Sequence, residues 1–233
     1  MREAVRTLRR AVNRAERDLI PTQQELDARL QLAAALMRDG EREAAVQHLR
    51  YVTLARPSFF SYRLAYAIAL RGSVSGSERA LEQLDICISI EEHIGPCWEL
   101  RGDILRELAR PEDAVRSYEH ALLLLDEDAE VLRSLTSAAL EAGQAERAAE
   151  AARELVDSLG AEIEFSTLLL AARAFEADGQ HEDAETFYRR AADAHRSSAR
   201  GLRLLLDYLR RSEQTEEASE IERRLSGLMN ERR

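Results

Sequence analysis

Lysine is absent from this sequence of 233 residues, and all 33 of its basic residues are arginine. Chemistry that needs a lysine amine, such as Schiff-base formation or phosphate binding by a P-loop, is therefore excluded. The motifs GxxxxGKS/T, GxGxxG, GxSxG and HExxH are also absent. This removes the main sequence indications of nucleotide binding, serine hydrolysis and zinc proteolysis. We therefore expect no enzymatic activity and no cofactor.

Cysteine is scarce, because the sequence contains only Cys87 and Cys97. Two cysteines form no disulfide framework and fit a reducing compartment, so we expect a cytoplasmic location. With His93 they give three soft ligands within eleven residues, but a zinc site needs a fourth ligand and usually a close CxxC spacing. We therefore expect no bound metal, with each cysteine packed as a small apolar residue on the inner face of its helix.

Strand-type alternation of apolar and polar residues is missing as well. Apolar residues instead recur three, four and seven positions apart, which is typical of a helix with one buried face. Residues 95–128 show this most clearly and predict two antiparallel helices joined by a tight turn. The first carries Trp98 and Gly102, and the second carries Ala114 and Tyr118. Gly102 and Ala114 are small, so the two helices can approach closely where these residues meet.

This order of residues resembles the tetratricopeptide repeat, a helix-turn-helix unit of about 34 residues. The position of Ala114 recurs at intervals of 35, 34, 34, 36 and 34 residues. The residues that the resemblance assigns to packing between helices are Ala45, Ala80, Trp98, Gly102, Ala114, Tyr118, Ala148, Ala184, Tyr188 and Ala218. It implies an all-α solenoid, a right-handed superhelix of six repeats at residues 26–59, 60–94, 95–128, 129–164, 165–198 and 199–232.

The turns between the helices carry their own pattern. Gly40, Gly143 and Gly179 follow the first helix of their repeats, where a left-handed cap favours glycine. The second repeat has a longer stretch of glycine and serine at residues 72–77, which we expect to be the most mobile turn inside the array. The fourth repeat is two residues longer than the pattern, and we place the extra length within residues 157–164.

Residues 1–25 precede the first repeat and lack the uninterrupted apolar core of a secretory signal. No later stretch of about 18 apolar residues is present to span a membrane. The segment has arginines on one side, and Val5, Leu8, Val12, Ala15 and Leu19 recur at helical spacing. We expect a helix that caps the first repeat; the alternative is contact with an anionic membrane surface. At the other end, Glu222 takes the position of Tyr118 and Tyr188, as suits a terminal repeat that faces solvent.

Charge is concentrated in the middle of the chain. Residues 95–164 hold 7 arginines and 17 acidic residues, a net charge of −10 that equals the net charge of the whole chain. An acidic belt of this kind argues against a nucleic-acid partner, which would require the opposite sign.

In the tetratricopeptide-repeat family the first helices of the repeats line a concave groove that binds peptides. Carried over residue by residue, this resemblance gives a groove with an apolar early part, an acidic middle and an arginine-rich late part. The candidate partner-binding residues are Leu30, Ala34, Met37, Leu64, Ile68, Glu99, Asp103, Arg133, Arg173 and Arg203. The family's clamp for a C-terminal carboxylate uses lysine and asparagine, and lysine is absent here, so that clamp is not expected in its usual form.

The resemblance therefore implies a scaffold or adaptor that binds a partner peptide or helix in the concave groove. One alternative is a scaffold that assembles with copies of itself as a homo-oligomer. Another is a secretion-type chaperone that shields an aggregation-prone client. The partner is not specified by the sequence, because a fold of this kind serves many different partners.

Overall fold

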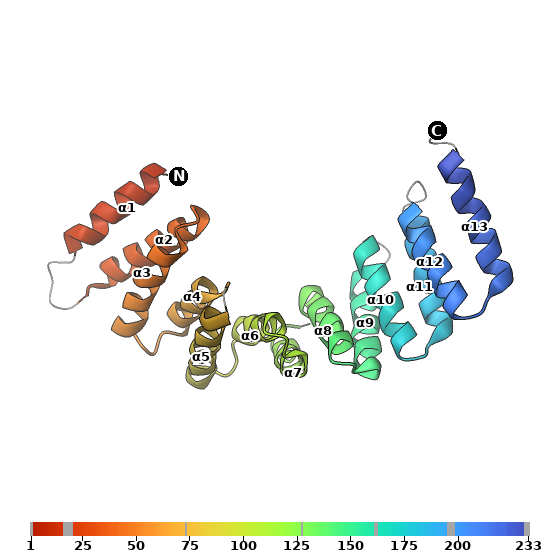
Figure 1. Ribbon diagram of the computed structural model, residues 1–233. Helices are drawn as coiled ribbons and strands as arrows, with labels where there is room; N and C mark the ends of the chain where they lie inside the picture. Colours follow the sequence, from red (N-terminus) through yellow and green to blue (C-terminus); the bar gives the residue numbers. More distant parts are fainter. Residues whose placement is uncertain are drawn as a thin grey trace. The chain divides into compact units, whose positions relative to one another are not determined.

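The computed structural model describes residues 2–15, 21–72, 74–126, 128–160, 163–194 and 199–230. These residues form thirteen α-helices and no β-strand, as the periodicity predicted (Figure 1). The helices are α1 (Arg2–Ala15), α2 (Gln23–Arg38), α3 (Arg42–Ala55), α4 (Phe60–Leu70), α5 (Val74–Ile90), α6 (Gly95–Glu107), α7 (Pro111–Leu122), α8 (Ala129–Glu141), α9 (Ala145–Leu159), α10 (Phe165–Ala177), α11 (His181–Ala194), α12 (Ala199–Arg211) and α13 (Thr215–Asn230). No helix in the described part of the chain is long and apolar enough to cross a bilayer.

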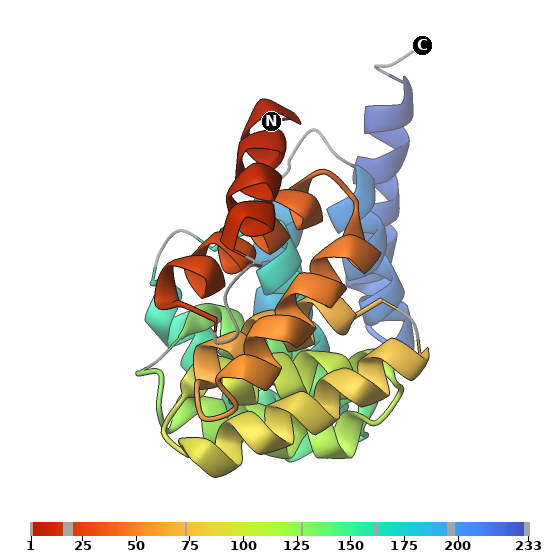
Figure 2. The same cartoon turned by 90° about the vertical axis from the view of Figure 1, so that its left-hand side faces the viewer.

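The chain divides into two compact units, Met1–Leu124 and Leu125–Arg233. The first unit contains α1 to α7. Its helices pack as the pairs α2–α3, α4–α5 and α6–α7, and each pair also contacts the next. Helix α1, which faces the viewer in Figure 2, packs on α2 and buries Val5 and Val12. Residues 16–20 of the expected capping segment lie outside the described residues.

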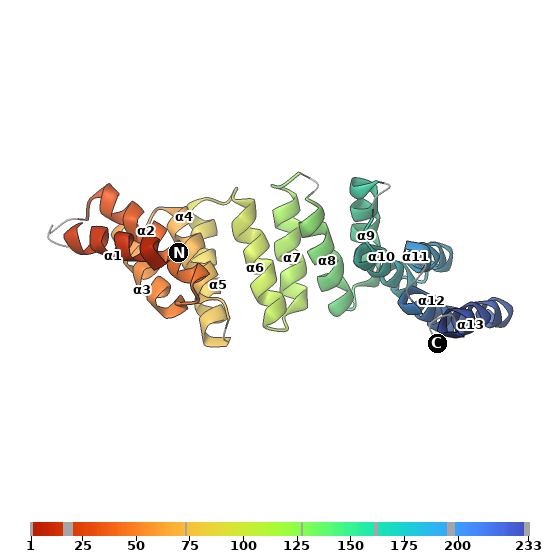
Figure 3. The same cartoon turned by 90° about the horizontal axis from the view of Figure 1, so that it is seen from above.

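The second unit contains α8 to α13 and repeats the same arrangement. Its pairs are α8–α9, α10–α11 and α12–α13, with further contacts from α9 to α10 and from α11 to α12. Figure 3 shows α6 beside α7 in the first unit and α8 beside α9 in the second, each pair antiparallel. The first helices of repeats two to six begin at Phe60, Gly95, Ala129, Phe165 and Ala199, the residues at which the sequence pattern set these repeats.

The six recurring alanines, which we call the alanine ladder, lie in the helix interfaces; they are Ala45, Ala80, Ala114, Ala148, Ala184 and Ala218. Five of these six residues have no exposed surface, and Ala218 is only 6 % exposed. Gly102 on α6 lies against α7, and an added Cβ there would lie 2.7 Å from the ring of Tyr118. A side chain at this point would therefore collide with the neighbouring helix, which explains why a glycine stands within α6 despite its low helix propensity.

Helix ends follow the local sequence. The Thr22 hydroxyl accepts a hydrogen bond from the Glu25 amide at 3.2 Å and caps α2, and the Asp128 carboxylate caps α8 in the same way. Gly40, Gly143 and Gly179 have φ values of 81°, 69° and 73°, so the predicted left-handed caps are present. The structure adds two that the sequence did not indicate, at Ala109 (φ 55°) and Glu213 (φ 61°).

The prediction of a long turn at residues 72–77 is wrong. Helix α5 begins at Val74, and both Gly76 and Ser77 are buried in its first turn. Their backbone groups are removed from water, so they are best satisfied by hydrogen bonds within a helix. Burial here overrides the preference of glycine and serine for turns. In the fourth repeat, α9 continues to Leu159 and has 15 residues, against 12 in α7, so the length added relative to the third repeat lies within α9. Gly160 follows with φ 64°, while residues 161 and 162 lie outside the described residues.

The two cysteines are not free thiols, which corrects the expectation from the sequence. Cys87 near the end of α5 and Cys97 in the first turn of α6 form a disulfide, with their Cα atoms 6.8 Å apart. Both face the same interface between successive helix pairs and both are fully buried. Their burial was predicted correctly, but the sequence did not show that the two side chains meet. The scarcity of cysteine therefore no longer supports a reducing compartment.

Candidate binding surface

An open apolar pocket of about 510 Å³ lies among α2, α3 and α4 in the first unit. We refer to it as the α2–α4 pocket. It is lined by Leu30, Ala33, Ala34, Met37, Arg38, Leu49, Ser61, Ala65 and Ile68. Four of these, Leu30, Ala34, Met37 and Ile68, are groove residues chosen from the sequence. Leu64, the fifth apolar candidate, is half-buried and does not line the pocket.

The spacing of the residues explains why the pocket forms. Positions 30, 34 and 37 of α2 and positions 61, 65 and 68 of α4 follow the same intervals of four and three, so each set lies along one face of its helix. Ala34 and Ala65 are small and leave room between the larger side chains. Ala33 and Leu49 are buried and close the floor. The sequence missed this floor, because buried residues of a repeat look like ordinary core.

The mouth of the α2–α4 pocket combines apolar surface with one charge. Ile68 is 48 % exposed, although it is a large apolar residue. The exposed Arg38 lies at the end of α2, and its Nε donates to the Ala34 carbonyl at 3.3 Å. The pocket therefore offers apolar contact to an incoming side chain and a guanidinium group at its edge.

The acidic candidates on α6 are engaged within the first unit. The Asp103 carboxylate accepts a hydrogen bond from the Tyr118 hydroxyl at 2.8 Å and pairs with Arg71 at 3.1 Å. Arg71 also pairs with Glu107 at 2.7 Å, and this hydrogen bond is the main reason why the pKa of Arg71 is raised. Glu99 has an interaction inside the chain too. The structure thus gives Asp103 a role in joining α4, α6 and α7.

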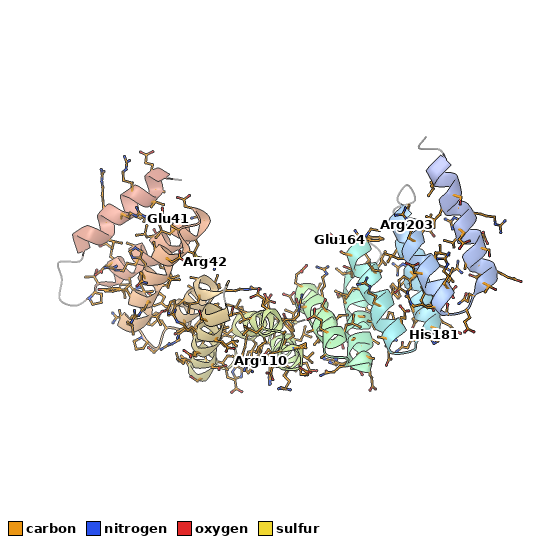
Figure 4. The ribbon with its side chains drawn as sticks, in the orientation of Figure 1. Glu41, Arg42, Arg110, Glu164, His181 and Arg203 are labelled. Carbon is orange, nitrogen blue, oxygen red and sulfur yellow. A yellow bond between two sulfur atoms is a disulfide. The ribbon has the colours of Figure 1, made fainter. Side chains whose placement is uncertain are left out.

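The arginine candidates lie on the first helices of the second unit. Arg133 on α8 pairs with Glu130 at 2.6 Å. Arg173 on α10 is exposed, as is Arg203 on α12, which Figure 4 labels. Neither forms an ion pair with another described residue. Of the charged candidates, Arg173 and Arg203 are therefore the two whose guanidinium groups are available to a carboxylate.

A second, polar pocket of about 460 Å³ lies between α3 and the α4–α5 turn and was not predicted. Its arginines already have partners. Arg42, labelled in Figure 4 at the start of α3, donates to the carbonyl oxygens of Ala69 and Arg71 at the end of α4. Arg79 donates to the Tyr66 hydroxyl at 3.0 Å. This pocket is accordingly explained by the capping of α4, where a cation is favourable.

Trp98 is a packing residue with a partly exposed ring. It stacks on His120 with ring centroids 4.4 Å apart, and its Nε1 donates to the Glu92 carbonyl at 3.0 Å. Through these two contacts the Trp98 ring links the α5–α6 connection to α7. His93 does not join the cysteines in a cluster, and the described residues contain no group of three or more potential metal ligands.

No protein-family model matches the sequence, and no curated protein matches it. Several solved structures are similar to this chain. A tetratricopeptide repeat protein from Parabacteroides merdae is 13 % identical, with a TM-score of 0.68 over 85 % of this chain and 77 % of that one. MamA from Desulfovibrio magneticus is 18 % identical, with a TM-score of 0.65 over 74 % and 96 %. YrrB, described as a TPR protein with an unusual peptide-binding site, is 15 % identical, with a TM-score of 0.63 over 81 % and 92 %.

At these identities the likeness concerns the fold. The chain has an all-α fold of the tetratricopeptide-repeat solenoid type, which is the fold that the alanine ladder predicted.

Proposed function

We propose that this protein is an interaction scaffold that holds a segment of a partner protein and has no catalytic activity of its own. The observation that carries the proposal is the α2–α4 pocket, which is open and apolar and brings together Leu30, Ala34, Met37 and Ile68. An exposed apolar pocket of this size takes a large apolar side chain and removes it from water, which is the main source of affinity in peptide recognition.

The partner segment is an amphipathic helix or an extended peptide with one apolar anchor. The edge of the pocket carries Arg38, so a carboxylate near the anchor adds a charge pair. Arg173 and Arg203 in the second unit are proposed to bind carboxylates of a partner there. These charges set the direction and the rate of binding more than its strength. Asp103 contributes indirectly, because it holds α6 in place.

Similar solved structures support this proposal at the level of the fold. YrrB has a peptide-binding site, and another similar structure is that of Naa15/Naa10 bound to HypK. A cytoplasmic location remains the proposal from the sequence, although the paired cysteines no longer favour it.

The test starts with peptides selected from a displayed library against the full chain, whose affinity is then measured by fluorescence anisotropy. Ile68→Glu places a charge in the α2–α4 pocket and should weaken binding by about tenfold or more. Ile86→Glu is the matched control, because Ile86 is also an exposed isoleucine but lies on α5 outside the pocket. Equal affinity for Ile68→Glu and the unchanged protein would contradict the proposal.

The arginines are tested separately. Arg173→Glu combined with Arg203→Glu should weaken binding of an acidic peptide more than Arg6→Glu combined with Arg10→Glu, although the change in net charge is the same. The difference should shrink as salt rises, because exposed charges are screened. Loss of binding only with the α1 variants would instead identify α1 as the binding surface.

A further inference from the structure

The first unit exposes a set of large apolar side chains outside the α2–α4 pocket. Leu54 at the end of α3 is 70 % exposed, and Phe59 and Phe60 at the start of α4 are 46 % and 38 % exposed. Ile86 and Ile90, one turn apart near the end of α5, are each 39 % exposed. We call these five residues the apolar edge. Scattered apolar residues on a surface need no explanation, whereas large apolar side chains that gather on one surface are typical of interaction sites.

One hydrogen bond and one close contact show that the three parts of the apolar edge are neighbours. The Thr53 hydroxyl donates to the Tyr62 carbonyl at 3.4 Å and joins the end of α3 to the start of α4. The Cys87 Sγ lies 3.8 Å from the Phe60 carbonyl oxygen and joins the start of α4 to the end of α5. Phe59 also stacks on Tyr62, with ring centroids 5.3 Å apart. The start of α4 therefore bridges the ends of α3 and α5.

The charges that flank the apolar edge differ between its two sides. Arg50 and Arg56 lie on the α3 side, whereas Glu91 and Glu92 directly follow Ile90 on the α5 side. None of these four side chains forms an ion pair with another described residue. By their position in the chain, the edge thus has basic residues on its α3 side and acidic residues on its α5 side, with the start of α4 between them.

We propose that the apolar edge pairs with the same edge of a second copy of this chain. In a two-fold symmetric contact, residue i of one copy meets residue j of the other and the reverse. Pairing about an axis near Phe60 therefore places Arg50 and Arg56 of each copy opposite Glu91 and Glu92 of the other. The charge pattern complements itself, which favours a second copy over a partner of uniform charge.

The net charge of the first unit agrees with this pairing. Residues 1–124 contain 18 arginines and 19 acidic residues, a net charge of −1, so two such units approach with little repulsion. The pairing does not depend on the α2–α4 pocket, because the pocket and the apolar edge share no residue.

The first experiment is sedimentation equilibrium of the full chain. We expect a reversible dimer at micromolar concentration, and we expect Ile86→Glu to weaken dimerisation by about tenfold or more. Ile68→Glu, at an exposed isoleucine of the α2–α4 pocket, is the control and should leave the dimer unchanged. The same two variants thus separate the two proposals, because peptide binding should show the opposite pattern.

The second experiment exchanges the charges. Arg50→Glu combined with Arg56→Glu makes both ends of the edge acidic, and Glu91→Arg combined with Glu92→Arg makes both ends basic. Each double variant should be monomeric alone, whereas an equimolar mixture should form a heterodimer. Both double variants keep a negative net charge, since each changes the value of −10 by four, to −14 or −6. General attraction between opposite net charges therefore cannot explain the mixed dimer.

A chain that stays monomeric at about 100 μM, where specific micromolar contacts are populated, would overturn the proposal. So would a dimer that Ile68→Glu disrupts and Ile86→Glu does not, because the copies would then meet through the α2–α4 pocket. A mixture of the two charge variants that remains monomeric would overturn the two-fold arrangement.

Discussion

The two units share one repeat pattern but have different surfaces. The first unit is almost neutral, whereas residues 125–233 contain 15 arginines and 24 acidic residues, a net charge of −9. Every exposed large apolar side chain among the described residues, from Tyr51 to Leu123, belongs to the first unit. The buried ladder specifies the helix pairs, so the outer positions are free to differ. The first unit is suited to apolar contact and the second to charged contact.

The interiors of the two units also differ. A disulfide joins α5 to α6 in the first unit. In the second unit, aromatic rings stack across the helix pairs, with centroids 5.4 Å apart for Phe175 and Phe187 and 4.8 Å apart for Tyr188 and Tyr208. The pKa of Tyr188 is raised, mainly by burial and then by its hydrogen bond to Glu176. Stacked rings also occur in the first unit, at Trp98 and His120, but at the interface between successive helix pairs a disulfide joins α5 to α6 whereas a tyrosine stack joins α11 to α12.

Reduction of the disulfide should have the largest effect and should act on the first unit alone. A bridge between residues ten positions apart limits the unfolded chain, and its loss should lower the free energy of unfolding by roughly 2–3 kcal/mol. The single tryptophan, Trp98, lies in the first unit, so its fluorescence during denaturation reports on this unit. Amide hydrogen exchange of α10 to α13 should remain unchanged.

The control for this measurement is the double variant Cys87→Ser, Cys97→Ser, which should match the reduced protein and show no further response to reductant. An equal loss of protection in both units would mean that they unfold together. No change in either unit would show that the bridge does not stabilise the fold.

Close packing at glycine gives the second comparison. An added Cβ at Gly201 on α12 would lie 2.7 Å from the Cα of Ala192, which is backbone and cannot rotate away. At Gly102 the obstacle is the Tyr118 ring, a side chain rather than backbone, although its burial and its hydrogen bond to Asp103 restrict its movement. We expect Gly201→Ala to cost about 1–3 kcal/mol and Gly102→Ala to fall at the lower end of this range.

Gly227 on α13 is the matched control, because a Cβ there meets nothing within 4 Å. Gly227→Ala should stabilise the helix by about 0.5–1 kcal/mol. Thermal unfolding followed by circular dichroism measures all three variants. Equal melting temperatures for Gly201→Ala and Gly227→Ala would contradict the close approach of α11 and α12.

Most of the fold could be predicted from the sequence, because the ladder residues are constrained by packing. Ala114 and its equivalents must be small wherever two helices meet, so their spacing is visible in one sequence. The start of α5 was misread for the opposite reason. Gly76 and Ser77 have the composition of a turn, and only tertiary burial makes them helical.

The candidate site was predictable in part. The helical phase identified Leu30, Ala34, Met37 and Ile68, which do line one pocket. It did not identify the engagement of Asp103 by Arg71 and Tyr118, because ion pairs between helices depend on side-chain reach rather than on phase. The phase places a residue on a face but does not show whether its charge is free.

Left-handed caps without glycine give the third prediction. Ala109 in the first unit and Glu213 in the second both have positive φ, which is unfavourable for residues with a Cβ. Ala109→Gly and Glu213→Gly should each raise the free energy of unfolding by about 0.5–1 kcal/mol, since relief of strain exceeds the added entropy of the unfolded chain. The reverse change Gly143→Ala should destabilise by a similar amount. Chemical denaturation of the three variants provides the test.

The smallest expected effect is the loss of stability in acid. It distinguishes a carboxylate with a charged hydrogen-bond donor from one with a neutral donor. The pKa of Asp113 in the first unit is lowered, mainly by its hydrogen bond from Arg110. The pKa of Glu185 in the second unit is lowered mainly by its hydrogen bond from the neutral amide of Gln214. A carboxyl whose folded-state pKa lies below its ordinary value of about 4 stabilises the protein fully above that value. The contribution is then lost as pH falls through the folded-state pKa.

Both units should therefore lose stability in acid, and the first should lose the larger part of this contribution when salt is added at neutral pH. At 1 M salt the screening length is about 3 Å, so the Asp113–Arg110 attraction weakens, whereas the hydrogen bond from Gln214 persists. Asp113→Asn should make unfolding of the first unit, followed by Trp98 fluorescence, less sensitive to both acid and salt. Glu185→Gln should mainly reduce the acid sensitivity of amide exchange in α11 and α12. Its effect on salt sensitivity should be small, because Arg189 contributes less than Gln214 to the lowered pKa. Equal salt sensitivity at the two carboxylates would show that charge, rather than hydrogen bonding, sets both pKa values.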